Sequence, residues 1–118
     1  MLRASAMTNE TEIDIQGING DGEAAATGIK FGEELMSFAE ALAAGESAPL
    51  SSSRDALLAK AGAEVLVDAS GVAANFQRMV RIADSIGIPV DNMETELGQQ
   101  IRKELGISSF ASAKNTLA

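Results

Sequence analysis

Apolar residues recur at intervals of three and four positions through most of the chain after residue 28, which is the spacing of amphipathic helices. The first such segment spans about residues 29–44. Acidic side chains lie there opposite an apolar stripe of Phe31, Leu35, Phe38, Ala39 and Leu42. Gly45 suits the left-handed position that ends helices, so we expect the first helix to stop there.

A second, shorter helix is expected before Gly62. Residues 46–50 include Pro49 and are interpreted as a connector. Three serines follow, and their hydroxyls are candidates to cap a helix that starts at Ser51–Ser53.

The longest periodic segment runs from about Glu64 to Ile86 and predicts the central helix. Its apolar face is about 140° wide at ~100° per residue. We single out five residues of this face, either as core or as a subunit interface: Val72, Phe76, Met79, Val80 and Ala83. Gly87 and Pro89 should end the helix.

Two further helices are expected near the end of the chain. Asp91 with Glu94 makes a capping-box-like start, and a stripe of Met93, Leu97, Ile101 and Leu105 follows up to Gly106. A last helix is expected over about residues 109–117. The sequence therefore predicts an all-α fold, with a compact array of about four to five helices in one domain over residues 28–118.

Residues 1–27 show no sustained helical periodicity and are predicted to form a flexible acidic tail. The alternation from Glu12 to Ile18 would suit a single strand, which could add to the sheet edge of a partner. The run from Asn19 to Glu23 lacks the ligand spacing of a calcium loop and is interpreted as a flexible turn.

Composition narrows the class of protein. The chain has 118 residues, 46% of them apolar and 22% charged, and no apolar run approaches the ~20 residues of a membrane-spanning helix. The first seven residues lack the apolar core of a signal peptide. With no cysteine to form disulfides, the expectation is a cytoplasmic protein without a membrane partner.

The net charge of −8 is concentrated in the first 50 residues, which carry −7. This balance disfavours nucleic acid as a partner, because phosphate backbones are bound by Lys and Arg. Four Phe and no Trp or Tyr offer little surface for stacking on bases. A helix-turn-helix over Glu96–Lys114 is an alternative, although its second helix would present only Lys114 and Asn115 to a groove.

Phe76, the segment Arg81-Ile82-Ala83-Asp84 and the exit Gly87-Ile88-Pro89 follow one another in a single stretch. In these motifs, residues 72–91 resemble the C-terminal helix region of alkylhydroperoxidase D-like proteins, which belong to the carboxymuconolactone decarboxylase superfamily. The resemblance implies an all-helical fold that often assembles into trimers or hexamers through helix contacts.

The resemblance does not extend to the chemistry of that family. Its peroxidases use a Cys-x-x-Cys pair with a nearby His and Glu, and this chain contains neither cysteine nor histidine. No other side chain supplies a nucleophile that attacks a peroxide and then forms a disulfide, so peroxidase activity of that kind is excluded. We expect no cofactor and no metal ion.

Charged residues of the central segment are the remaining candidates for a ligand site. Arg78, Arg81 and Asp84 are spaced by three residues, so they could clamp an anionic ligand or simply pair on the helix surface. Asp68 lies at the edge of the apolar face, where partial burial could make it a general base or where it could hold a neighbouring helix end. Gly71 lowers the stability of a helix relative to alanine, so we expect it to be there for close approach of a second helix, either within the chain or from another subunit.

Two functional hypotheses follow. The first is a non-catalytic, self-associating helical protein that works through helix-face contacts. The alternative is a divergent carboxymuconolactone decarboxylase-like enzyme or small-ligand binder, which would use Glu64, Asp68, Arg78 and Arg81. The residue pattern leans towards a protein that is not an enzyme.

Overall fold

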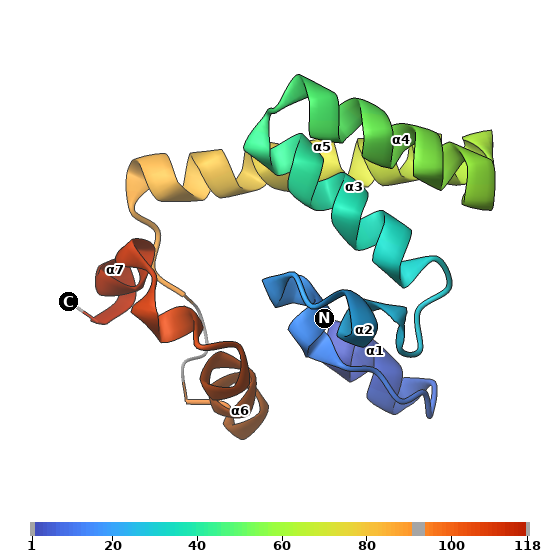
Figure 1. Ribbon diagram of the computed structural model, residues 1–118. Helices are drawn as coiled ribbons and strands as arrows, with labels where there is room; N and C mark the ends of the chain where they lie inside the picture. Colours follow the sequence, from blue (N-terminus) through green and yellow to red (C-terminus); the bar gives the residue numbers. More distant parts are fainter. Residues whose placement is uncertain (1, 91–93, 118) are drawn as a thin grey trace. The chain divides into compact units, whose positions relative to one another are not determined.

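The computed structural model describes residues 2–90 and 94–117. Over these residues the chain is built from α-helices and 3₁₀ turns, without a strand, so the all-α class is confirmed. Figure 1 shows the helices in chain order. The chain divides into two compact units, residues 1–75 and 76–118, and the division falls within the longest helix, α5 (Ala63–Ile86).

The first unit contains the N-terminal part of α5 and all elements before it. These are α1 (Leu2–Thr8), the 3₁₀ helix η1 (Ile15–Asn19), α2 (Gly22–Ala26), α3 (Gly32–Ala44) and α4 (Ser47–Ala61). In Figure 1 they run from blue to green.

The strand expected over Glu12–Ile18 is wrong, because this stretch turns into η1. The carboxylate of Asp14 accepts a hydrogen bond of 2.9 Å from the backbone N–H of Gln16 and so caps η1. Asp21 caps α2 in the same way, at 3.0 Å from the N–H of Ala24. Two short acidic side chains thus start helical turns where the sequence analysis expected a tail and a flexible turn.

The segment expected as a tail also contributes to the core of the first unit. Ile15 is 2% exposed, and Ala6, Ala24 and Ala25 are buried as well. α2 lies against both η1 and α3. Because these contacts join residues before and after position 27, the expected boundary at 27/28 does not separate two units.

Glycines allow the backbone of α2 to approach its neighbours closely. A Cβ added to Gly17 would lie 2.8 Å from the Cα of Ala25, and one added to Gly32 would overlap the carbonyl oxygen of Ala25. Gly17 is in η1 and Gly32 opens α3, so one alanine of α2 is held between two glycines. Any larger residue at these positions would push the elements apart.

α3 and α4 pack together over their length and supply the remaining core. Phe38 and Ala41 of α3 are buried, and Leu57 of α4 has no exposed surface. At the edge of this contact, the ammonium of Lys60 lies 2.6 Å from a carboxylate oxygen of Glu34, whose side chain is only 13% exposed. This ion pair lowers the pKa of Glu34, chiefly through the hydrogen bond from Lys60, and raises the pKa of Lys60.

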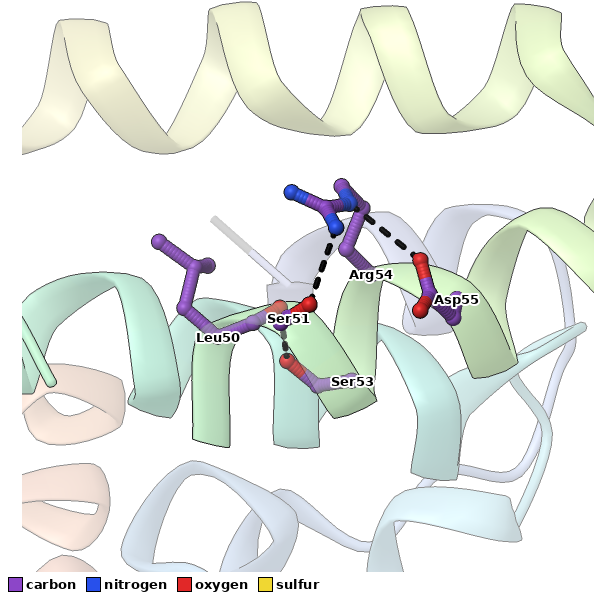
Figure 2. A network of polar contacts seen from close by, with 5 residues as sticks. All are labelled: Leu50, Ser51, Ser53, Arg54 and Asp55. Carbon is purple, nitrogen blue, oxygen red and sulfur yellow. Dashed lines mark hydrogen bonds and ion pairs between the residues drawn. The ribbon is translucent and has the colours of Figure 1, made fainter. Parts of the chain in front are cut away.

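α4 begins at Ser47, four residues before the expected start, so the three serines are not N-caps. Pro49 is accommodated because the N–H groups of the first helical turn have no partner within the helix. Figure 2 shows what the serines do instead. Buried Ser53 donates a hydrogen bond to the carbonyl of Leu50 at 3.2 Å, and Ser51 accepts one from Arg54 at 3.0 Å.

The second unit contains the C-terminal part of α5 and the elements after it. These are α6 (Glu96–Leu105), the 3₁₀ turns η2 (Ile107–Ser109) and η3 (Ala111–Ala113), and α7 (Lys114–Leu117). The helix expected over 109–117 is therefore only partly α-helical, because its first half lies in 3₁₀ turns and α7 is four residues long. The expected cap residue Asp91 and the stripe residue Met93 lie outside the described residues.

The predicted helix ends after α3, α5 and α6 are confirmed. Gly45, Gly87 and Gly106 have φ angles of +73°, +64° and +65°, which is the left-handed conformation that glycine adopts at little cost. These ends could be located from the sequence because each depends on a single local residue.

Replacing Gly32 by alanine should destabilise the first unit by about 1–3 kcal/mol, the usual cost of forcing an extra methyl group into a closely packed contact. The matched control is Gly71→Ala in α5, where a Cβ meets no atom within 4 Å. That variant should gain roughly 0.5–1 kcal/mol from helix propensity. Urea unfolding followed by circular dichroism measures both, and equal effects would contradict the close approach of Gly32 to Ala25.

The Glu34–Lys60 ion pair should make the free energy of unfolding depend on pH in the acid range. The pKa of Glu34 is lowered from its ordinary 4.5. The ion pair therefore contributes to the free energy of unfolding above pH 4.5, and this contribution is lost as the pH falls through the lowered pKa of the folded state. Glu34→Gln should therefore flatten the loss of stability between about pH 5 and 3. Glu40→Gln, an exposed glutamate on the same helix, should leave that slope in place.

Candidate functional site

The apolar face of α5 is largely exposed over the described residues. No residue of α5 is buried. Of the five residues singled out in the sequence, Val72, Phe76, Met79 and Val80 are 59%, 55%, 50% and 53% exposed, and Ala83 is half-buried. These four side chains are therefore not core residues of this chain, and the interface alternative remains a prediction.

The charged candidates of α5 lie at the surface. Asp68, Arg78, Arg81 and Asp84 are all exposed, and no ion pair joins Arg81 to Asp84 among the described residues. The partial burial on which a general-base role for Asp68 depends is not found. For Gly71, the open space around its Cα shows that no other helix of the described chain approaches it.

The second unit contains a concave site of about 320 Å³, which is near the lower end of the range for small-molecule pockets. Its wall is mainly apolar and comes from α5, the loop after it and the turns after α6. The large apolar side chains are Val80, Ile88, Val90, Ile107 and Phe110, with Ala83 beside Val80 on the helix.

Polar side chains of several kinds lie on the lining of this pocket, among them Ser108 and Ser112. Asp84 comes from α5, Arg102 from α6, and Asn115 and Thr116 from α7. The hydroxyl oxygen of Thr116 accepts a hydrogen bond of 2.9 Å from the backbone N–H of Val90, which holds Val90 to α7. This bond connects residues 26 positions apart, and both of them line the pocket.

The two charged groups of the pocket are held differently. The guanidinium of Arg102 folds back along its own helix, so that its Nη1 would lie 3.2 Å from a Cβ added to Gly98. Within the described part of the chain, the carboxylate of Asp84 forms neither a hydrogen bond nor an ion pair. Asp84 is thus the charged group of the pocket that is open to a ligand.

The structure brings together only part of the predicted site. Val80, Ala83 and Asp84 line the pocket, whereas Glu64, Asp68, Arg78 and Arg81 do not. The sequence analysis did not name Arg102, Phe110 or Thr116 as site residues, and it named Asn115 only for the helix-turn-helix alternative. The positions of Phe110, Asn115 and Thr116 depend on the path of the chain through the 3₁₀ turns after Gly106, and no local pattern predicts that path.

The helix-turn-helix alternative is wrong. After α6 the chain forms two turns of three residues and a helix of four, so it offers no second helix long enough to enter a DNA groove. Over the described residues, no group of three or more acidic side chains is arranged to share a metal ion. None of the described helices combines the length and the apolar character needed to cross a membrane.

No protein-family model matches this chain, and neither a curated protein nor a solved structure matches it.

Proposed function

We propose that this protein is a non-catalytic, self-associating helical protein, and that two copies join through the apolar stripe of α5. The stripe consists of Ala69, Val72, Ala73, Phe76, Met79, Val80 and Ala83. The observation that carries the proposal is the exposure of its large members, of which each is at least half exposed.

Leaving this stripe in water is costly. Covering one side chain the size of Val, Met or Phe contributes about 1.5–3 kcal/mol when burial is complete. α5 has 24 residues and is therefore about 36 Å long at ~1.5 Å per residue. Most helical stability in proteins comes from packing of the apolar face rather than from helix propensity.

A second copy of the chain is the partner that the stripe fits best. The sequence of the stripe reads almost the same in both directions from Phe76, with Val72 and Val80 four residues to either side and Ala69 and Ala83 seven residues to either side. A two-fold contact between antiparallel helices needs this symmetry, because residue i then meets residue j and j meets i. Phe76 would lie on the two-fold axis.

Charge supports the same partner. The stripe contains no charged residue, so two copies can meet there without like charges in contact, although each copy carries a net charge of −8. Alanines at the ends of the stripe allow the two helix backbones to approach closely. The resemblance of residues 72–91 to a family that often assembles through helix contacts favours self-association as well.

The solution mass tests whether the protein associates. Light scattering behind a sizing column should give the wild type at least twice the 12.2 kDa of one chain. Phe76→Glu should return the protein to the mass of one chain, because it places a charge at the centre of the contact. The matched control is Ala74→Glu, which adds the same charge at an exposed position outside the stripe. A monomeric wild type would overturn the proposal.

Disulfide trapping tests the antiparallel arrangement. Because the chain has no native cysteine, only the introduced cysteines can form disulfides. Ala69→Cys and Ala83→Cys chains are mixed and oxidised. Antiparallel helices should give a disulfide between position 69 of one chain and position 83 of the other, since the two positions are equally far from Phe76. Parallel helices would instead join two chains at the same position, 69 to 69 or 83 to 83. In the antiparallel contact, the two copies of either site are about 21 Å apart at ~1.5 Å per residue, well beyond the ~7 Å reach of a disulfide.

A further inference from the structure

We propose that the pocket of the second unit binds a small organic ammonium ion with an apolar alkyl or aryl body. The pocket combines an apolar wall with one carboxylate, Asp84, that is open to a ligand. This inference does not depend on self-association, because one chain supplies the whole lining of the pocket, which shares only Val80 and Ala83 with the stripe.

The apolar wall determines the body of the ligand. Val80, Ile88, Val90 and Phe110 line the pocket and are each more than half exposed, so a ligand that covers them removes apolar surface from water. A volume of about 320 Å³ suits a ligand with a single ring or a short chain better than a larger one.

Asp84 determines the charge of the ligand. A carboxylate accepts strong hydrogen bonds from an ammonium group, and such charge-assisted bonds exceed those between neutral groups. The competing choice is an anion at Arg102, but that guanidinium folds back over Gly98 of its own helix. The net charge of −8 also attracts cations to the protein and repels anions.

The position of Asp84 allows both interactions at once. On α5 it follows Ala83 directly and lies four residues after Val80, so its carboxylate and the side chain of Val80 lie on neighbouring parts of the helix surface. Both side chains line the same pocket. A ligand whose ring or chain contacts Val80 can therefore place an ammonium group at Asp84.

Three probes that differ mainly in charge test the proposal: 2-phenylethylammonium, neutral 2-phenylethanol and anionic 3-phenylpropanoate. Titration into ¹⁵N-labelled protein should shift the amide signals of Val90 and Asn115, which belong to the pocket. The ammonium ion should bind more tightly than the alcohol, and the alcohol more tightly than the carboxylate. Asp84→Asn should weaken binding of the ammonium ion about tenfold, as expected for loss of a charge-assisted hydrogen bond, and should leave the alcohol unchanged.

Asp68→Asn is the matched control, because it removes an exposed carboxylate from the same helix outside the pocket. It should leave the affinity for the ammonium ion within about twofold of wild type, since screening by salt weakens the effect of charges outside the pocket. Equal effects of the two variants would show attraction by overall charge and would overturn the proposal. Binding of the carboxylate as tight as that of the ammonium ion, or no shift at the pocket amides, would overturn it too.

Discussion

A long helix is stable in water mainly because one of its faces is buried against another surface, and α5 meets this requirement only in part. Its first turns are half-buried at Val65, Leu66 and Ala69, whereas Val72, Phe76, Met79 and Val80 further along are exposed. α3 and α4 do not have this problem to the same degree, because they cover each other. The uncovered stretch of α5 is therefore the feature that any account of this protein has to explain.

The first unit shows how the chain forms a core from few large side chains. Among the described residues, the buried large apolar side chains are Ile15, Phe38 and Leu57, and the rest of the buried apolar core is alanine. Small side chains stabilise a contact only when the backbones approach closely, because dispersion forces decline steeply with distance. Gly17 and Gly32 allow that approach at Ala25. The large apolar residues of α5 are thus not needed to fill this core, which leaves them available for contact with another molecule.

The helices could be predicted from the sequence where local signals determine them. The period of apolar residues located α3 and α5, and Gly45, Gly87 and Gly106 located three helix ends. The segment before residue 28 was misjudged because Asp14 and Asp21 start turns too short to show a period. The start of α4 was misjudged because serines suggest caps, although the hydroxyl of Ser53 can bond within the helix to Leu50. Tertiary placement, such as that of Thr116 beside Val90, has no local signal at all.

The two proposed sites share side chains, and this has a consequence for how they would act together. Val80 and Ala83 belong to the stripe of α5 and also line the pocket of the second unit. Apolar surface that is covered once cannot be removed from water a second time. A ligand that covers Val80 therefore leaves less surface for a second copy to bury. Linkage then requires that association weaken ligand binding by the same factor by which the ligand weakens association. Self-association and ligand binding would in that case be opposed states of one helix face, with Val80 and Ala83 as the residues that couple them.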